Sequence, residues 1–137
     1  MKHVLIALVL IAVLIAACGP SKCDTGVFAK QLYPKFQEFQ DAVTLAGSTP
    51  RMQLAAPLAD LQRIRRDTGQ IEIDPSCTEV LKAHSYLLDG MDYTVKGFIS
   101  FLGQEPDYMV DSQFTMATQN LDSFNHMIEG WNESQTP

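Results

Sequence analysis

The stretch PDYMVDSQFTMATQNLDSFNHMIEGW, residues 106–131, has the most regular hydrophobic pattern in the chain. Its apolar residues recur at alternating steps of four and three, at Val110, Phe114, Ala117, Leu121, Phe124, Ile128 and Trp131. This spacing predicts an α-helix that opens at Pro106 and buries one face. The pattern is typical of one seam of a helical bundle.

Two helices are predicted in the first half of the domain. The segment from Asp24 to about Ala46 has apolar residues at Phe28, Leu32, Phe36, Phe39, Val43 and Ala46. Pro34 either kinks this helix or makes it begin near Tyr33. Thr49 is expected to be the N-cap of the second helix and Pro50 its first residue. That helix carries Leu54, Leu58, Leu61 and Ile64 on one stripe, is expected to bend at Pro57 and ends near Gly69.

A third helix is predicted after Asp74-Pro75, by the same reasoning of a cap followed by a proline. Its apolar stripe runs through Cys77, Val80, Leu81, Leu87, Leu88, Met91, Val95, Phe98 and Phe101. Gly103 ends it. The preceding Ile71-Glu72-Ile73 alternates as a strand would, but without a partner strand it is expected to be an extended connection.

Four helices with short connections predict an all-α fold, an antiparallel up-down-up-down four-helix bundle over residues 24–137. In that topology the first and third helices start at the same end. Cys23 and Cys77 therefore lie at one end of the bundle.

The N-terminus has the features of an export signal. Lys2 and His3 precede an apolar run from Val4 to Ala17 that is shorter than the about 20 residues of a membrane-spanning helix. The run ends in Ile15-Ala16-Ala17-Cys18, which resembles the lipobox of bacterial lipoproteins. The alternative is an uncleaved signal anchor with an incidental cysteine.

The resemblance implies that a peptidase removes residues 1–17 and that Cys18 carries a diacylglyceryl group and fatty-acyl chains such as palmitate. Residues 18–23 then form a short linker beside the membrane. The domain is expected in the cell envelope, lipid-anchored on the extracytoplasmic side of a bacterial membrane. The sequence does not decide between the inner and the outer membrane. An aspartate directly after the lipidated cysteine would resemble the signal for retention at the inner membrane. Gly19 occupies that position, which favours the outer membrane.

With Cys18 acylated, Cys23 and Cys77 are the two remaining thiols, in a compartment where disulfides persist. We predict that they pair, which in the chain-entropy model stabilises the fold by about 4 kcal/mol. Two free, separately buried cysteines are the alternative.

Charge narrows the choice of partners. Of ten Lys and Arg side chains only Lys2 lies in the signal, which leaves nine against sixteen Asp and Glu. This acidic balance argues against nucleic acid and against adhesion to anionic lipid headgroups. The expected partners are the membrane, through the lipid on Cys18, and an envelope protein.

Residues that carry chemistry are sparse. Asp122 and His126 share a helix face, but a surface pair is preferred to a metal site. The cluster of Arg63, Arg65 and Arg66 is interpreted as a solvated helix end, with a site for an acidic partner as the alternative. Two carboxylate pairs, Asp89 with Asp92 and Asp107 with Asp111, each lie on one helix without an evident cleft. We therefore predict no enzymatic activity, no metal and no cofactor.

Two functional hypotheses follow, and a hydrolase or other enzyme whose carboxylates meet only in the fold is a third alternative. The first is a non-enzymatic interaction or structural module with some exposed apolar surface, involving Tyr108 or Trp131. The second is a bundle that binds a small ligand or haem. It requires a cavity lined by Phe98, Phe101, Phe114 and Phe124, with His84 or His126 as the polar ligand. Met91 and Met127 are interpreted as packing residues.

Overall fold

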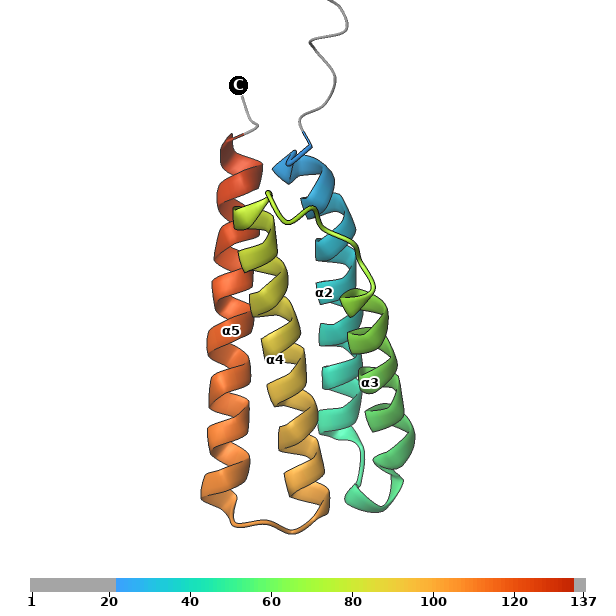
Figure 1. Ribbon diagram of the computed structural model, residues 1–137. Helices are drawn as coiled ribbons and strands as arrows, with labels where there is room; N and C mark the ends of the chain where they lie inside the picture. Colours follow the sequence, from blue (N-terminus) through green and yellow to red (C-terminus); the bar gives the residue numbers. More distant parts are fainter. Residues whose placement is uncertain (1–21, 135–137) are drawn as a thin grey trace, which may run out of the picture.

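Four antiparallel α-helices make up most of the part of the chain that the structure describes. The computed structural model describes residues 22–134, so the predicted signal 1–17 and the predicted lipidation site Cys18 lie outside the described residues. The helices are α2 (Thr25–Ser48), α3 (Ala55–Gly69), α4 (Thr78–Leu102) and α5 (Asp107–Ser134), with a short 3-10 helix η1 (Arg51–Gln53) after α2. They run alternately down and up, so both ends of the described chain lie at one end of the bundle (Figure 1). The predicted all-α up-down-up-down bundle is confirmed.

The first helix begins where the sequence predicts. The Asp24 carboxylate accepts hydrogen bonds from the backbone N–H groups of Gly26 and Val27, at 2.9 and 3.2 Å, and so caps α2. The helix runs through Pro34 rather than starting near Tyr33. Pro34 is exposed, as is Lys30 one turn before it, so water can satisfy the carbonyl that the proline leaves without a donor.

The start of the second helix differs from the prediction. Thr49 is the C-cap of α2, and its hydroxyl donates to the Leu45 carbonyl at 2.7 Å. A threonine hydroxyl can donate to the free carbonyls that end one helix as well as accept from the N–H groups that start the next. Helix α3 begins at Ala55, which places Pro57 in its first turn, where a missing N–H breaks no helical hydrogen bond. The bend predicted at Pro57 is therefore not required.

The third helix also begins later than predicted. Asp74 and Pro75 form a turn in which the Asp74 carboxylate accepts from the N–H and hydroxyl of Ser76, and Cys77 is the N-cap of α4. Helix α3, at 15 residues, is shorter than α4, at 25. The extended residues 71–74 cover the remaining length, and Ile71 and Ile73 pack on the core. Residues 71–74 lie outside any helix or strand, which confirms the interpretation of Ile71-Glu72-Ile73 as a connection rather than a strand.

One continuous core runs between the helices. Its fully buried large side chains include Leu32, Phe39, Leu61, Leu87, Met91 and Phe124. Helices α4 and α5 approach closely because α4 has glycine at two positions that face α5. A Cβ on Gly90 would lie 2.6 Å from Leu121 side-chain atoms, and one on Gly97 would lie 2.9 Å from the Phe114 ring. These glycines are needed for space.

Alanine at two helical glycines is expected to change stability in opposite directions. Gly130 of α5 has open space around it, so Gly130→Ala should raise the free energy of unfolding by about 0.5–1 kcal/mol through helix propensity. Gly90→Ala meets Leu121, and overpacking of about 1–3 kcal/mol should exceed that gain. Urea denaturation of both variants measures the difference. Equal stabilisation by both would contradict the close packing of α4 on α5.

The turn between α4 and α5 explains one error in the predicted core. Gly103 ends α4 as predicted, but Gln104 adopts the left-handed conformation, with φ of 56°. The N–H groups of Gln104 and Glu105 donate to the carbonyls of Phe101 and Ser100. Phe101 was predicted to be buried, yet its side chain is 40 % exposed because it lies in the last turn of α4, at the end of the bundle. Helix α5 begins at Asp107, one residue after the predicted start.

Candidate interaction surfaces

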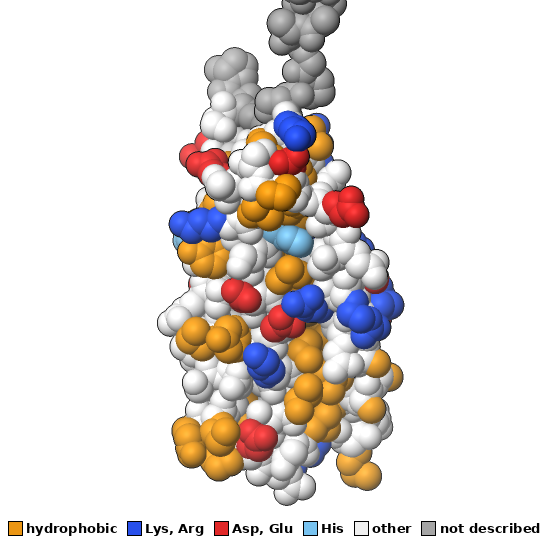
Figure 2. Space-filling view, in the orientation of Figure 1, with side chains coloured by type: hydrophobic (Ala, Val, Ile, Leu, Met, Phe, Trp, Pro, Cys, Tyr) orange, Lys and Arg blue, Asp and Glu red, His pale blue; other side chains and the backbone are white. Residues whose placement is uncertain are grey.

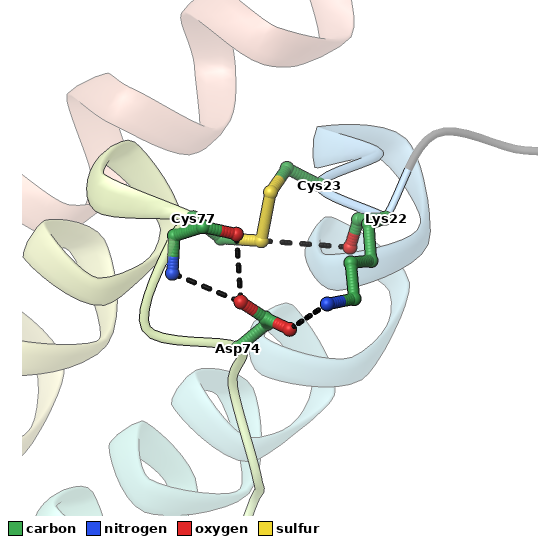
Figure 3. Close-up of a disulfide and its surroundings, with 5 residues drawn as sticks. Lys22, Cys23, Asp74 and Cys77 are labelled. Atoms are coloured by element: carbon green, nitrogen blue, oxygen red, sulfur yellow. Dashed lines mark hydrogen bonds and ion pairs between the residues drawn. A yellow bond between two sulfur atoms is a disulfide. The ribbon is translucent and has the colours of Figure 1, made fainter.

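The predicted disulfide joins the starts of α2 and α4. Cys23 and Cys77 are bonded, with their Cα atoms 5.2 Å apart. Lys22 and Asp74 form an ion pair beside the bond (Figure 3). The Cys77 Sγ atom lies 3.5 Å from the Lys22 carbonyl, a contact rather than a hydrogen bond because a disulfide sulfur carries no proton. The bond thus joins two chain segments that are 54 residues apart. It lies at the end of the bundle where the described chain begins.

The Asp74 carboxyl group should resist protonation. Its hydrogen bond with Lys22, and those from Ser76, hold its pKa well below the ordinary value. A lowered pKa stabilises the fold above the unfolded-state value of about 3.9, and this contribution is lost only as the pH falls through the lower folded-state pKa. In an NMR titration, Asp74 should therefore stay ionised below pH of about 3.9, and Lys22→Gln should raise its midpoint. An ordinary midpoint in both proteins would contradict the ion pair.

The two histidines of the described residues, His84 and His126, lie in different environments. His84 is buried, and its Nε2 lies 2.8 Å from the Thr68 carbonyl oxygen. A carbonyl can only accept, so Nε2 carries the hydrogen and His84 satisfies a carbonyl at the C-terminal end of α3. His126 is exposed and lies 3.6 Å from Glu129 rather than pairing with Asp122. The two histidines thus have separate partners, on α3 and α5.

The four phenylalanines proposed to line one cavity lie in separate contacts. Phe98 packs edge-on against Phe114, with ring centroids 5.2 Å apart, and Phe124 packs similarly on Phe36 at 5.3 Å. The guanidinium of Arg51 covers Phe101 at 4.7 Å. Aromatic pairs of this kind fill space between helices. Trp131 is also buried, whereas Tyr108 is 72 % exposed.

The basic cluster of α3 is largely paired within the domain. Arg65 makes two hydrogen bonds with the Asp92 carboxylate, at 2.6 and 2.7 Å, and the Asp92 bond raises the Arg65 pKa. Arg63 contacts the carboxylates of Asp60, Asp67 and Glu38. Side chains of both charges are interspersed on the face seen in Figure 2. Arg63 and Arg65 are thus balanced by carboxylates of α2, α3 and α4, whereas Arg66 is exposed and makes no ion pair within residues 22–134.

A cavity of about 330 Å³ opens between α2 and α5. Its apolar lining consists of Phe36, Phe39, Val43, Phe114, Ala117 and Leu121. Among its polar residues, the hydroxyls of Thr44 and Thr118 donate within their own helices, to the carbonyls of Gln40 and Phe114. Asp122 supplies its one carboxylate.

A shallow hollow on α5 adjoins this cavity. It is lined by Asp111, Phe114, Thr115, Thr118 and Gln119, so Phe114 and Thr118 belong to both. We call the cavity and the hollow together the α5 groove. Sequence reasoning did not find it, because a groove between α2 and α5 depends on how far apart two helices lie. The polar residues Thr115 and Thr118, beside the apolar stripe, could have suggested an open edge.

Apolar side chains are exposed at the end of the bundle opposite the chain termini. They come from the α2–α3 and α4–α5 connections and the helix ends beside them: Leu45, Met52, Ile99, Phe101, Tyr108 and Met109. Figure 2 shows apolar side chains at this end. Met52 is 97 % exposed. We call this surface the distal end.

Neither a metal-binding group of side chains nor a membrane-spanning helix is present among the described residues. Within residues 22–134, no group of three or more His, Cys, Asp or Glu side chains is arranged to hold a metal ion. In the same part of the chain, no helix has the length and apolar character that crossing a membrane requires.

Comparisons of the chain with protein-family models, curated proteins and solved structures found no match.

Proposed function

We propose that the chain is a bacterial envelope lipoprotein, anchored through lipid on Cys18, whose bundle acts as a non-enzymatic interaction or structural module. The observation that carries this proposal is the disulfide between Cys23 and Cys77. Disulfides persist in compartments outside the cytoplasm, where a lipobox would deliver the domain. Cys23, which fixes the start of the bundle through the disulfide, follows Cys18 by only five residues in the sequence.

This placement gives the anchored domain an orientation. Five extended residues reach at most about 18 Å, so the disulfide end would face the bilayer. Helix α5 has 28 residues and a length of about 42 Å, which carries the distal end away from the lipid. The exposed side chains there, such as Met52 and Tyr108, are then available to other envelope components rather than to the anchoring membrane.

A non-enzymatic role is supported by how the reactive side chains are used. His84 is hydrogen-bonded to Thr68, and Asp92 is paired with Arg65. The α5 groove contains carboxylates but no histidine or cysteine. General acid-base catalysis needs a side chain held within hydrogen-bond reach of the reacting group, and histidine most often has this role. The side chains that line the groove are better suited to binding than to proton transfer.

Intact mass of the protein purified from its native envelope tests the proposal. The expected mass starts at residue 18, includes a diacylglyceryl group and acyl chain on Cys18, and lacks two hydrogens for the disulfide. Cys18→Ala should leave an unprocessed precursor. The matched variant Cys23→Ser with Cys77→Ser should keep the lipid. An unmodified Cys18 on a full-length chain would refute the anchor.

An absorption spectrum and metal analysis of the same sample test the alternative of a haem- or ligand-binding bundle. A colourless, metal-free protein is expected. A Soret band or stoichiometric metal would overturn the proposed role as a cofactor-free module. It would direct attention to His84 and His126.

A further inference from the structure

The α5 groove combines an apolar floor with an uncompensated acidic edge. Phe114 and Leu121 line it from α5, and Phe36 and Val43 line it from α2. The Thr44 and Thr118 hydroxyls at its rim are already bonded within their helices. A ligand that fills the groove thus buries apolar surface and leaves few polar groups without partners.

Negative charge is concentrated along α5. No Lys or Arg follows Lys96 in the chain. The acidic residues of α5 are Asp107, Asp111, Asp122, Glu129 and Glu133. They are separated by four, eleven, seven and four residues, close to whole numbers of helical turns, so all five share one side of the helix. All five are exposed.

These carboxylates are not neutralised by the rest of the bundle. Within residues 22–134, Glu129 contacts only His126 among basic side chains, and the other four make no ion pair. Glu38, Asp60, Asp67 and Asp92, in contrast, are paired with arginines. Asp122 lines the cavity and Asp111 lines the adjoining hollow. Two of the five α5 carboxylates, neither of them in an ion pair, therefore lie at the apolar groove itself.

We propose that the α5 groove is the docking site for a basic amphipathic segment of a protein partner. Apolar side chains of that segment enter the cavity between α2 and α5, and its Lys or Arg side chains lie along the carboxylates of α5. The inference rests on the proposed role as an interaction module and names the chemistry of the partner.

Charge complementarity selects this occupant over two others. Anionic lipid headgroups would be repelled by the carboxylates around Asp111 and Asp122. A second copy of the chain would bring the same acidic face against this one, which is also repulsive. A basic polypeptide segment supplies both the apolar side chains and the positive charge that the groove lacks.

Residues 22–134 contain the whole bundle with its own core and disulfide, so binding can be measured on the domain from residue 19 onward, without lipid. The probe is a labelled amphipathic peptide of Leu and Lys with about 18 residues, which spans about 27 Å as a helix. A Leu and Glu peptide with the same apolar stripe is one control. A Ser and Lys peptide without the stripe is the other. Fluorescence anisotropy at low and high salt gives the dissociation constants.

Two variants test the groove. Asp111→Asn with Asp122→Asn should weaken binding of the Leu and Lys peptide about tenfold, because two exposed ion pairs are lost. The matched pair Glu72→Gln with Glu79→Gln makes the same change in net charge away from the groove, and should change the dissociation constant less than about twofold. Thr118→Trp, at an exposed rim position, should block binding while circular dichroism stays unchanged.

Binding of only the Leu and Lys peptide, weakened by the groove variants alone, supports the proposal. Equal effects of the two charge-neutralising pairs would overturn it by showing non-specific attraction. Equal binding of the Leu and Glu peptide, or of phosphatidylglycerol vesicles, would also overturn it, as would a dimer that Thr118→Trp dissociates. These outcomes are separate from the mass of Cys18, so failure of the groove leaves lipid anchoring to its own test.

Discussion

Replacing Cys23 and Cys77 together by serine is expected to lower the free energy of unfolding by about 4 kcal/mol. The bond joins two residues that are 54 apart in the sequence. In the chain-entropy model, the loss of stability arises because the unfolded chain without this cross-link has more conformational entropy. A loss of this size is a large share of the about 5–15 kcal/mol that stabilises a typical domain. Urea denaturation of the double variant, and of the unchanged protein with reductant, measures the loss.

The ion pair beside the disulfide gives the control. Lys22→Gln removes the contact with Asp74 but keeps the covalent bond, and the Lys22 side chain is 77 % exposed. A surface ion pair contributes about 0–1 kcal/mol, so the control should unfold almost as the unchanged protein does. If the serine variant behaved like this control, and the reductant had no effect, the cysteines would be free thiols. The disulfide could then no longer support delivery outside the cytoplasm.

The general fold could be predicted because helical periodicity and helix-ending residues agree along the chain. The apolar stripe from Phe114 to Trp131 needs only the 3.6-residue repeat to place it on one face, and Pro106 and Gly103 separate α5 from α4. The pairing of Cys23 with Cys77 then followed from the topology and the number of cysteines. Such features are local or nearly so, and a single sequence contains them.

The errors arose where one residue type can serve two structural roles. Thr49 and Asp74 are good helix caps, but Thr49 ends α2 and Asp74 forms a turn. The sequence does not specify which role each residue takes, because the choice depends on where the packed helices on either side of it begin and end. The α5 groove was missed for a related reason, since it depends on the separation of α2 and α5. The absence of Lys and Arg after Lys96 was visible in the sequence and could have drawn attention to that side.

Two phenylalanines that the sequence places equally in the core should differ strongly when replaced by alanine. Phe124→Ala removes a ring that is 0 % exposed and packs on Phe36, so the free energy of unfolding should fall by about 3–5 kcal/mol. Phe101→Ala removes a ring that is 40 % exposed and loses mainly its contact with the Arg51 guanidinium. At such an exposed site that contact contributes about 0.5–1 kcal/mol.

Thermal and urea unfolding of both variants give the comparison, and peptide binding adds a second readout. Phe36 lines the α5 groove and packs on Phe124, so Phe124→Ala should also weaken binding of the Leu and Lys peptide. Phe101 does not line the groove, so Phe101→Ala should leave that binding unchanged. Similar losses of stability in the two variants would mean that Phe101 is buried, as its place in the apolar stripe suggests. The last turn of α4 would then belong to the core, and the distal end would present less apolar surface to a partner.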